Sequence, residues 1–435
     1  MNRGLIGTLS TSVAIALLAG CHAPPASSSV VPESANAAPT ATRFHAGRAR
    51  FQVLYRFPGY AIDGWNPQAS LMDVNGTLYG TTEYGGSGTG CQYGCGTVFS
   101  IGASGTEKIL HDFTGGSDGS HPVAALTDVD GTLYGTTSSG GSVRGCYGDG
   151  CGTVFSITTS GSETVLHAFP GPPDVAKPQA PLIELNGTLY GTTSFGGKTS
   201  SGFCQQGCGT VYSMTPSSST EKVLHAFTGG DGWYPVAGLT EVNGILYGTT
   251  IHGGGAGCGG FAGCGTVFGI TKSGREKLLH GFGGGSDGDS PQAGLIDLNG
   301  ILYGTTNFGG TSSRYGTVYS ITTGGVEKVL HAFTGGSDGY YPLGGLTAGN
   351  GKLYGTTAGG GRTGSCGGGC GTIFSVTTAG AIKSFSAFAR VEAAKPSTTL
   401  LEVNGTLYGT TPHDLRGRGP CKKPGHCGAV FSFRP

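Results

Sequence analysis

Charged residues are scarce in this sequence of 435 residues: Asp, Glu, Lys and Arg together make up only 11% of it. The 25 basic residues balance the 25 acidic ones, so the formal net charge at pH 7 is zero. Without a basic surface, nucleic acid is not expected as a partner. The sequence also lacks a nucleophile elbow, a phosphate-binding loop, a dinucleotide fingerprint and a zinc-protease helix. It therefore indicates no catalytic residue and no cofactor, although an active site assembled from distant parts of the chain would leave no such motif.

Long apolar runs are also absent, apart from one near the N-terminus. There, Arg3 precedes a short apolar run that ends in Leu18-Ala19-Gly20-Cys21, which resembles the lipobox of a bacterial lipoprotein. The resemblance implies that residues 1–20 are a signal peptide and that lipidated Cys21 anchors the mature protein in a membrane. An ordinary secretory signal with a chance cysteine is the alternative. Because His22 rather than Asp follows Cys21, resemblance to the common sorting pattern implies the outer membrane.

Residues 21–50 are rich in Pro, Ala and Ser and show no hydrophobic periodicity. This composition is typical of a flexible tether, which we expect to join the lipid anchor to a folded body of residues 51–435. In that body the chain is rich in glycine, which occurs at fixed places in a repeating apolar pattern and indicates turns rather than disorder.

The body is built from a repeat. The pentapeptide Leu-Tyr-Gly-Thr-Thr occurs seven times, and its tyrosines are Tyr79, Tyr134, Tyr190, Tyr247, Tyr303, Tyr354 and Tyr408. Each unit has four short strand-like runs, which in the second unit are residues 123–129, 132–137, 153–157 and 164–169. Asp-Gly or Asn-Gly joins the first two runs and is a strong hairpin signal. The pattern predicts an all-β fold, a seven-bladed β-propeller with four antiparallel strands in each blade.

The two ends of the repeat region complement each other. The last unit ends at its third run, residues 429–433, whereas residues 51–57 match a fourth run that has no third run before it. We therefore expect the N-terminal strand to complete the last blade and close the ring, which leaves no exposed sheet edge. An open array of units and a two-layer sandwich are the alternatives.

The repeat centred on Leu-Tyr-Gly-Thr-Thr, which spans residues 51–435, resembles the GloVer (gloeo/verruco) repeat family of exported and surface-anchored bacterial proteins. The resemblance implies a propeller-like repeat fold and export from the cytoplasm. The family brings no established reaction, substrate or catalytic residue, so the resemblance leaves function open.

Cysteines occur in pairs in the loop between the second and third strand-like runs. The fifth unit lacks both members of the pair, as expected if the two cysteines of one loop bond to each other. A metal site is the alternative, but each loop offers only two of the four ligands that a tetrahedral site needs. We predict no metal and six structural disulfides: Cys91–Cys95, Cys146–Cys151, Cys204–Cys208, Cys258–Cys264, Cys366–Cys370 and Cys421–Cys427.

Each link between blades has an acidic residue four positions before a proline: Asp63, Asp118, Asp174, Asp231, Asp287, Asp338 and Glu392. In a closed ring we expect these acids to form a circle near the mouth of the central channel, on the face with the longer loops. They are interpreted either as turn formers, since Asp-Gly suits an Asx-type turn, or as ligands of a cation or another bound molecule. In two links Ala-Lys-Pro follows, so Lys177 and Lys395 bring positive charge to the same rim.

Aromatic residues follow the acid in three of these links, two or three positions later. Exposed aromatic rings beside carboxylates can stack on sugar rings or anchor a protein interface. The alternative is that they pack against neighbouring loops. The rim thus predicts a ligand-binding site made of Asp63, Asp231, Asp338, Trp65, Trp233, Tyr234, Tyr340, Tyr341, Lys177 and Lys395.

A histidine recurs in the fourth run of five units: His111, His167, His225, His280 and His331. Its repetition on the outermost strand indicates a structural hydrogen-bonding group between blades rather than a general base. Tyr55 and Ser386 replace it in the other two units.

Together these features favour a lipid-anchored, extracytoplasmic propeller that acts as a non-catalytic binding or scaffold protein for a glycan or protein partner. The first alternative is a carbohydrate-active enzyme, a hydrolase or lyase, that uses Asp231 and Asp289 with Lys177 or Lys395. The second alternative is an architectural protein of the cell envelope whose aromatic residues are buried.

Overall fold

The computed structural model describes residues 50–59, 63–141, 146–199, 204–255, 258, 263–361, 366, 368–385, 388, 394–412 and 427–435. Residues 48–435 form one compact unit. The predicted signal peptide, Cys21 and almost all of the tether lie outside the described residues. Within those residues, no helix has the length and hydrophobicity that crossing a bilayer requires.

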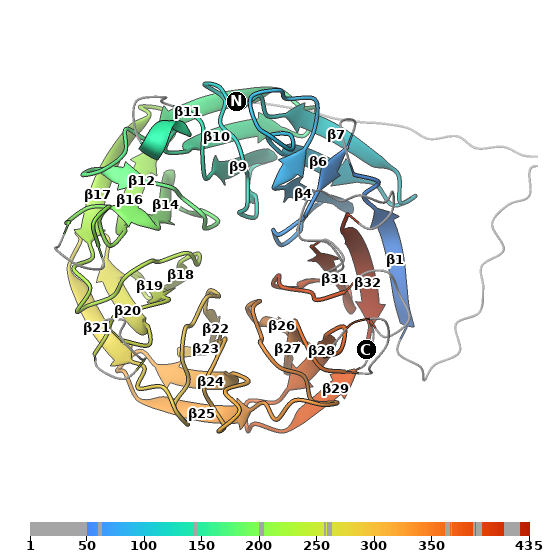
Figure 1. The fold of residues 1–435 in the computed structure, drawn as a ribbon, viewed down its shortest axis with the longest axis vertical. Helices are drawn as coiled ribbons and strands as arrows, with labels where there is room; N and C mark the ends of the chain where they lie inside the picture. Colours follow the sequence, from blue (N-terminus) through green and yellow to red (C-terminus); the bar gives the residue numbers. More distant parts are fainter. Residues whose placement is uncertain are drawn as a thin grey trace, which may run out of the picture. The chain divides into compact units, whose positions relative to one another are not determined.

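Seven four-stranded antiparallel sheets stand around a central axis as the blades of a propeller (Figure 1). From blade 1 to blade 7, the innermost strands are β3 (Met72–Val74), β8 (Thr127–Val129), β13 (Ile183–Leu185), β18 (Thr240–Val242), β22 (Ile296–Leu298), β26 (Thr347–Gly349) and β30 (Leu401–Val403). The second strands are β4 (Thr77–Thr82), β9 (Thr132–Thr137), β14 (Thr188–Thr193), β19 (Ile245–Thr250), β23 (Ile301–Thr306), β27 (Lys352–Thr357) and β31 (Thr406–Thr411).

The third strands are β6 (Thr97–Ile101), β10 (Thr153–Thr158), β16 (Thr210–Thr215), β20 (Thr266–Thr271), β24 (Thr317–Thr322), β28 (Thr372–Val376) and β32 (Ala429–Arg434). The outermost strands are β7 (Glu107–Asp112), β11 (Glu163–Ala168), β17 (Thr220–Ala226), β21 (Glu276–Gly281), β25 (Glu327–Ala332), β29 (Ile382–Phe385) and, in blade 7, β1 (Arg50–Arg56). Loop residues add two short ladders, β2 (Gly64–Trp65) with β5 (Tyr84–Gly85) and β12 (Val175–Ala176) with β15 (Phe195–Gly196), and one 3-10 turn, η1 (Cys146–Gly148). The predicted seven-bladed, all-β architecture is confirmed.

The N-terminal strand closes the ring as the sequence predicts. Strand β1 pairs antiparallel with β32, with Phe51 opposite Phe433, and the two ends of the chain's body lie side by side in blade 7 (Figure 1). The ring of Phe51 also stacks on that of Phe431, with centroids 5.3 Å apart. Blade 7 is tied to blade 1 as well, because the Thr410 hydroxyl donates to the Ala69 carbonyl oxygen at 3.0 Å.

The repeated Tyr-Gly-Thr-Thr sequence has a packing reason at each position. At the glycine, the backbone lies against the aromatic ring of the third strand: a Cβ on Gly248 would be 2.5 Å from Phe268 Cζ. The first threonine bonds to the next blade, as Thr81 does by donating to Ala124 O at 3.1 Å. The second bonds within its own blade, where the Thr82 and Thr97 hydroxyls are 2.9 Å apart. The motif therefore fixes both the core of a blade and its contact with the next one.

The innermost strands are shorter than predicted. In blade 2 the expected run of residues 123–129 contributes only β8, Thr127–Val129, to the sheet. The preceding residues line the central channel instead, and the neighbouring blade's threonine hydroxyl binds the carbonyl group of Ala124. The small side chains of this run thus serve the channel rather than a strand pair.

Five of the six predicted disulfides are formed within the described residues: Cys91–Cys95, Cys146–Cys151, Cys204–Cys208, Cys258–Cys264 and Cys366–Cys370. Their Cα atoms are 4.9 to 5.3 Å apart, within the usual range for a disulfide. Cys421 of the sixth pair lies outside the described residues.

Candidate binding site

The residue directly before the proline of each link adopts the same backbone conformation in all seven links. These residues, which we name the pre-proline ring, are Asn66, His121, Lys177, Tyr234, Ser290, Tyr341 and Lys395, and their φ angles lie between 55° and 65°. A positive φ is unfavourable for a residue with a side chain and is kept only where the surrounding structure enforces it. The seven links therefore share one enforced geometry.

Backbone hydrogen bonds hold the pre-proline ring from two sides. The amide of Tyr234 donates to the carbonyl oxygen of Cys208 at 3.0 Å, and its own carbonyl accepts from the amide of Ile251 at 3.3 Å. Equivalent cysteine carbonyls hold five of the other members, and Tyr315 O takes this role in the unit without cysteines, at 2.9 Å from the amide of Tyr341. Because the disulfide fixes the cysteine loop, the loop of one blade positions the link to the next.

The side chains of the pre-proline ring differ although the backbone is constant. The ring contains two lysines, two tyrosines, one asparagine, one histidine and one serine. Asn66 and Ser290 are buried, and the other five are partly exposed. A position that only maintained the fold would be expected to keep one residue type in every blade, as the glycine and threonines of the second strand do.

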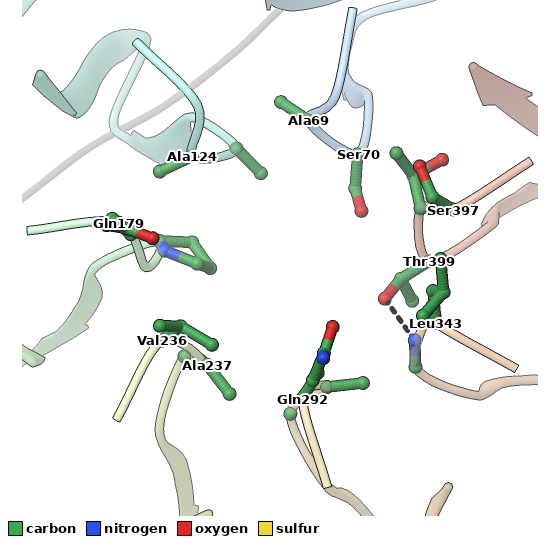
Figure 2. A pocket seen from close by; sticks show the side chains of 18 of the residues that line it. Ala69, Ser70, Ala124, Gln179, Val236, Ala237, Gln292, Leu343, Ser397 and Thr399 are labelled. Atoms are coloured by element: carbon green, nitrogen blue, oxygen red, sulfur yellow. Dashed lines mark hydrogen bonds between the residues drawn. The ribbon is translucent and has the colours of Figure 1, made fainter. Parts of the chain in front are cut away.

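The central channel opens directly beside this ring. Two positions after each pre-proline residue comes a channel-lining residue: Gln68, Val123, Gln179, Val236, Gln292, Leu343 and Ser397. Together with the residues that follow them, they enclose a cavity of about 290 Å³, and none of its described lining residues is charged. Figure 2 shows the carboxamides of Gln179 and Gln292 and the hydroxyls of Ser70, Ser397 and Thr399 arranged around this space.

The channel mouth thus combines carboxamide and hydroxyl groups with small apolar side chains. Gln179 Nε2 is 3.3 Å from Ser194 Oγ, and Thr399 Oγ1 accepts from the amide of Gly345 at 2.9 Å (Figure 2). Neutral groups that both donate and accept suit a neutral ligand with hydroxyl groups rather than an ion.

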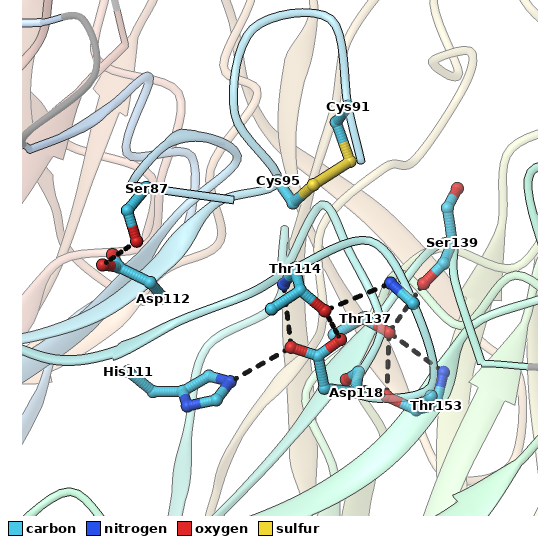
Figure 3. A network of polar contacts seen from close by, with 11 residues as sticks. Ser87, Cys91, Cys95, His111, Asp112, Thr114, Asp118, Thr137, Ser139 and Thr153 are labelled. Atoms are coloured by element: carbon cyan, nitrogen blue, oxygen red, sulfur yellow. Dashed lines mark hydrogen bonds and ion pairs between the residues drawn. A yellow bond between two sulfur atoms is a disulfide. The ribbon is translucent and has the colours of Figure 1, made fainter. Parts of the chain in front are cut away.

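The acidic residues of the links do not form the expected circle at the channel mouth. Their side chains turn toward the outermost strands: Asp118 Oδ2 lies 3.5 Å from His111 Nε2 of β7 and accepts from the amide of Thr114 at 2.8 Å (Figure 3). For five of the seven acids the expectation of a circle at the channel mouth is wrong, because each carboxylate contacts a residue of the neighbouring outermost strand: Asp63, Asp118, Asp231, Asp287 and Asp338. This corresponds to the turn-forming interpretation of these residues.

Asp231 and Asp338 follow the same arrangement. Asp231 Oδ2 is 3.0 Å from His225 Nε2, and Asp338 Oδ1 is 3.2 Å from His331 Nε2. Burial alone would raise the pKa of Asp231, but hydrogen bonds from His225 and Thr228 lower it below its ordinary value. These contacts support the structural interpretation of the recurring histidines.

Asp63 has a different partner because Tyr55 replaces the histidine in β1. The Tyr55 hydroxyl donates to Asp63 Oδ2 at 2.5 Å. Asp63 is only 6% exposed, and burial raises its pKa. Asp174 and Lys177 belong to the same link between blades, and Asp174 is exposed. Glu392 lies outside the described residues.

The two tryptophans pack against neighbouring residues rather than lying exposed on the surface. Trp65 is 6% exposed and stacks on Tyr84 with ring centroids 4.6 Å apart. Trp233 is partly buried in the core between blades 3 and 4, and its ring centroid lies 5.0 Å from that of His252. The ring of Trp65 is therefore not available on the surface to stack on a sugar, and it stabilises its loop instead.

Three tyrosines gather where the fifth unit lacks its disulfide. Tyr315 occupies the place of the missing second cysteine, and its ring centroid is 5.3 Å from that of Tyr340. Tyr340 contacts Tyr341 edge to face at 4.8 Å and donates to Gly368 O at 2.7 Å. Tyr315 is a residue that sequence reasoning missed, although the loss of both cysteines in that loop marked the place.

The two carboxylates considered for hydrolysis are not brought together. Asp231 belongs to the link between blades 3 and 4, where it contacts His225. Asp289 belongs to the next link, is 4% exposed and forms an ion pair with Arg314. Lys177 and Lys395 lie in two further links as members of the pre-proline ring.

Comparison with known proteins gives a family. The model of the Gloeobacter/Verrucomicrobia repeat matches residues 31–205 and 199–421. No curated protein matches the sequence. Among solved structures, an oligogalacturonate lyase in complex with manganese is 10% identical, with a TM-score of 0.49 over 89% of this chain and 96% of that chain.

Two further solved structures have unrelated roles. A gluconolactonase from Xanthomonas campestris is 12% identical, with a TM-score of 0.42 over 89% of this chain and 90% of that chain. A chain of the nidogen/laminin complex is 14% identical, with a TM-score of 0.39 over 67% of this chain and 90% of that chain. At these identities and scores the similarities say nothing about what the present chain binds or catalyses.

Proposed function

The chain belongs to the Gloeobacter/Verrucomicrobia repeat family, and from this premise we propose that it is a non-catalytic, extracytoplasmic binding protein that recognises a glycan at the channel mouth. The observation that supports this most is the pre-proline ring. Seven positions with one enforced backbone carry five different residue types. Rigid backbones with varied side chains are typical of recognition surfaces held by a scaffold.

The chemistry of the channel mouth supports a glycan as the ligand. Glutamine, serine and threonine side chains of the cavity can donate to and accept from sugar hydroxyls. Tyr234 and Tyr341 of the adjacent ring are partly exposed and can contact the apolar face of a sugar. Lys177 and Lys395 would add preference for an acidic or phosphorylated sugar.

We further propose that the protein is exported and held by a lipid on Cys21 at the outer membrane. The disulfides support export, since such bonds persist in oxidising compartments. A tether of some 30 residues has a typical end-to-end distance of about 30 Å, which would let the propeller bind a ligand a short way from the membrane surface.

Binding to a glycan array, followed by calorimetry with the selected glycan, tests the proposal. Tyr234→Ala with Tyr341→Ala, and separately Gln179→Ala with Gln292→Ala, should each weaken binding about tenfold or more, because each pair removes two contacts worth about 1 kcal/mol apiece. The control Val326→Ala changes a residue that is 72% exposed, in the turn between strands β24 and β25, and should leave the affinity unchanged.

Three results would contradict the proposal. If both double variants bind the glycan as tightly as the parent, the site lies elsewhere. If no glycan binds and a captured envelope protein does, the protein-partner alternative replaces it. Turnover of a polysaccharide that Asp231→Asn or Asp289→Asn abolishes would instead establish an enzyme.

A further inference from the structure

Two blade interfaces each bring one histidine and two carboxylates together. Between blades 3 and 4 these are His225 on β17, Asp231 in the link and Glu276 on β21. Between blades 4 and 5 the equivalent residues are His280, Asp287 and Glu327. In each group the imidazole nitrogen and one oxygen of each carboxylate all lie within 4.8 Å of one another.

The histidine and the aspartate of each group are at hydrogen-bond distance, which is close to the spacing of two ligands around one ion. His225 Nε2 is 3.0 Å from Asp231 Oδ2, and His280 Nε2 is 3.2 Å from Asp287 Oδ1. Two ligands that bind a common metal at about 2.0–2.2 Å with tetrahedral geometry are roughly 3.4 Å apart. The glutamate oxygen of each group lies within 4.8 Å of the other two ligand atoms, so it has to move closer to complete the site.

The glutamates of both groups also have an unpaired carboxylate oxygen, a feature that they share with Glu107, Glu163 and Glu221 of other blades. The Oε1 atoms of Glu276 and Glu327 have no contact with solvent and no hydrogen-bond partner. A buried carboxylate oxygen without a partner is costly, and a cation or a proton must offset that cost.

We propose that the His225–Asp231–Glu276 and His280–Asp287–Glu327 groups each bind one divalent transition-metal ion, with Zn²⁺ as the best match. Imidazole nitrogen and carboxylate oxygen are both zinc ligands, and three such ligands leave a fourth position for water. Calcium prefers oxygen ligands only, so it fits these groups less well. Each ion would join residues of two adjacent blades, so the two ions would connect blades 3, 4 and 5 at their outermost strands.

The other interfaces show that the arrangement is not a property of every blade. Between blades 5 and 6, His331 and Asp338 keep their contact at 3.2 Å, but Ile382 occupies the place of the glutamate. Between blades 1 and 2 the histidine and aspartate are farther apart, at 3.5 Å. A third group, Cys258, Cys264 and Asp289, is not a candidate because its two cysteines form a disulfide.

Metal content of the full chain, purified without a histidine tag, tests this proposal. After treatment with a chelator, the protein is dialysed against Zn²⁺ and the bound metal is counted by mass spectrometry, with calorimetry for affinity. We expect two ions per chain in the parent, one in His225→Ala, one in His280→Ala and none in the double variant. His331→Ala is the matched control, because it changes the equivalent histidine beside Ile382, and should retain two ions.

Glu276→Gln and Glu327→Gln serve as a second pair of variants with nearly unchanged size. Each should weaken one of the two sites at least tenfold, and Co²⁺ bound to the parent should show visible absorption bands that the double glutamine variant loses. An unchanged metal count in the double histidine variant would overturn the proposal, as would loss of metal from His331→Ala. Failure of the parent to bind Zn²⁺ at micromolar concentration would show that a proton or water alone satisfies the glutamates.

Discussion

Glutamate recurs at the start of the outermost strand, as Glu107, Glu163, Glu221, Glu276 and Glu327. In all five the Oε1 atom is buried without a hydrogen-bond partner. For Glu163, burial, with a smaller contribution from the Asp118 carboxylate, raises the pKa from 4.5 to about 7. The carboxyl group of Glu163, at the interface between two blades, therefore binds its proton more tightly in the folded protein than in the unfolded protein.

This pKa shift gives a prediction for Glu163→Gln. Because the folded pKa is raised, Glu163 contributes stability below pH 4.5 that is lost as the pH rises through 7. The glutamine variant cannot ionise, so it should match the parent near pH 5 and be more stable at pH 8. After discounting for partial exposure the gain is about 1 kcal/mol, or about 2 °C in melting temperature.

Thermal unfolding of both proteins at pH 5 and pH 8, in the presence of a chelator, measures this difference. Glu184→Gln is the control, since the Glu184 carboxylate accepts from the amide of Gly187 in a turn and its removal should bring no gain. Equal melting temperatures of Glu163→Gln and the parent at pH 8 would contradict the prediction.

The second strand is the element whose sequence is most strictly set by packing. Gly248→Ala would place a methyl group 2.5 Å from the ring of Phe268. Backbone and ring must then move apart, so we expect the free energy of unfolding to fall by about 1–3 kcal/mol. Gly102→Ala is the matched control because a Cβ there meets nothing within 4 Å, and its effect should stay within about 0.5 kcal/mol. Chemical denaturation of the two variants measures both values, and equal destabilisation would show that the glycine is not required by the ring.

Most elements could be predicted from the sequence because their signals are local. The Asn-Gly and Asp-Gly turns adopt positive φ at both residues, as at Asn75 and Gly76, and the paired cysteines bond within their loops. The innermost strands were predicted too long because the pattern of apolar residues does not distinguish residues of a strand from residues that line a channel. The ladder between β2 and β5 was not predicted either, since two residues carry no periodic signal.

The candidate site was harder to predict, because the direction of a link side chain depends on the neighbouring blade. The aspartates were correctly singled out, but only the structure shows that Asp118 turns toward His111. For Trp65 the sequence left open whether the ring is exposed or packed, and the structure shows that Tyr84 and Tyr93 pack against it. Conversely, the pre-proline ring became visible only through its backbone angles, since its seven residues, of five different types, form no motif.

At the scale of the whole molecule, everything proposed for the channel mouth depends on a ring closed by β1. Phe57 at the end of this strand is completely buried, and its amide donates to Gly428 O at 3.0 Å. Without β1, the edge of β32 and the ring of Phe431, on which Phe51 stacks, would be exposed to water. Loss of the packing of the partly buried Phe51 alone costs about 3 kcal/mol, and the lost strand pairing adds to that cost.

Deletion of Arg50–Arg56 is the measurement that tests ring closure most directly, with deletion of residues 22–49 as its control. We predict that removal of the strand lowers the melting temperature by about 10 °C or prevents folding, and that the control deletion melts like the parent. A synthetic peptide of residues 50–59 added to the shortened protein should restore its stability, whereas a scrambled peptide should not. A protein without Arg50–Arg56 that melts at the parent's temperature and ignores the peptide would contradict a ring closed by its first strand.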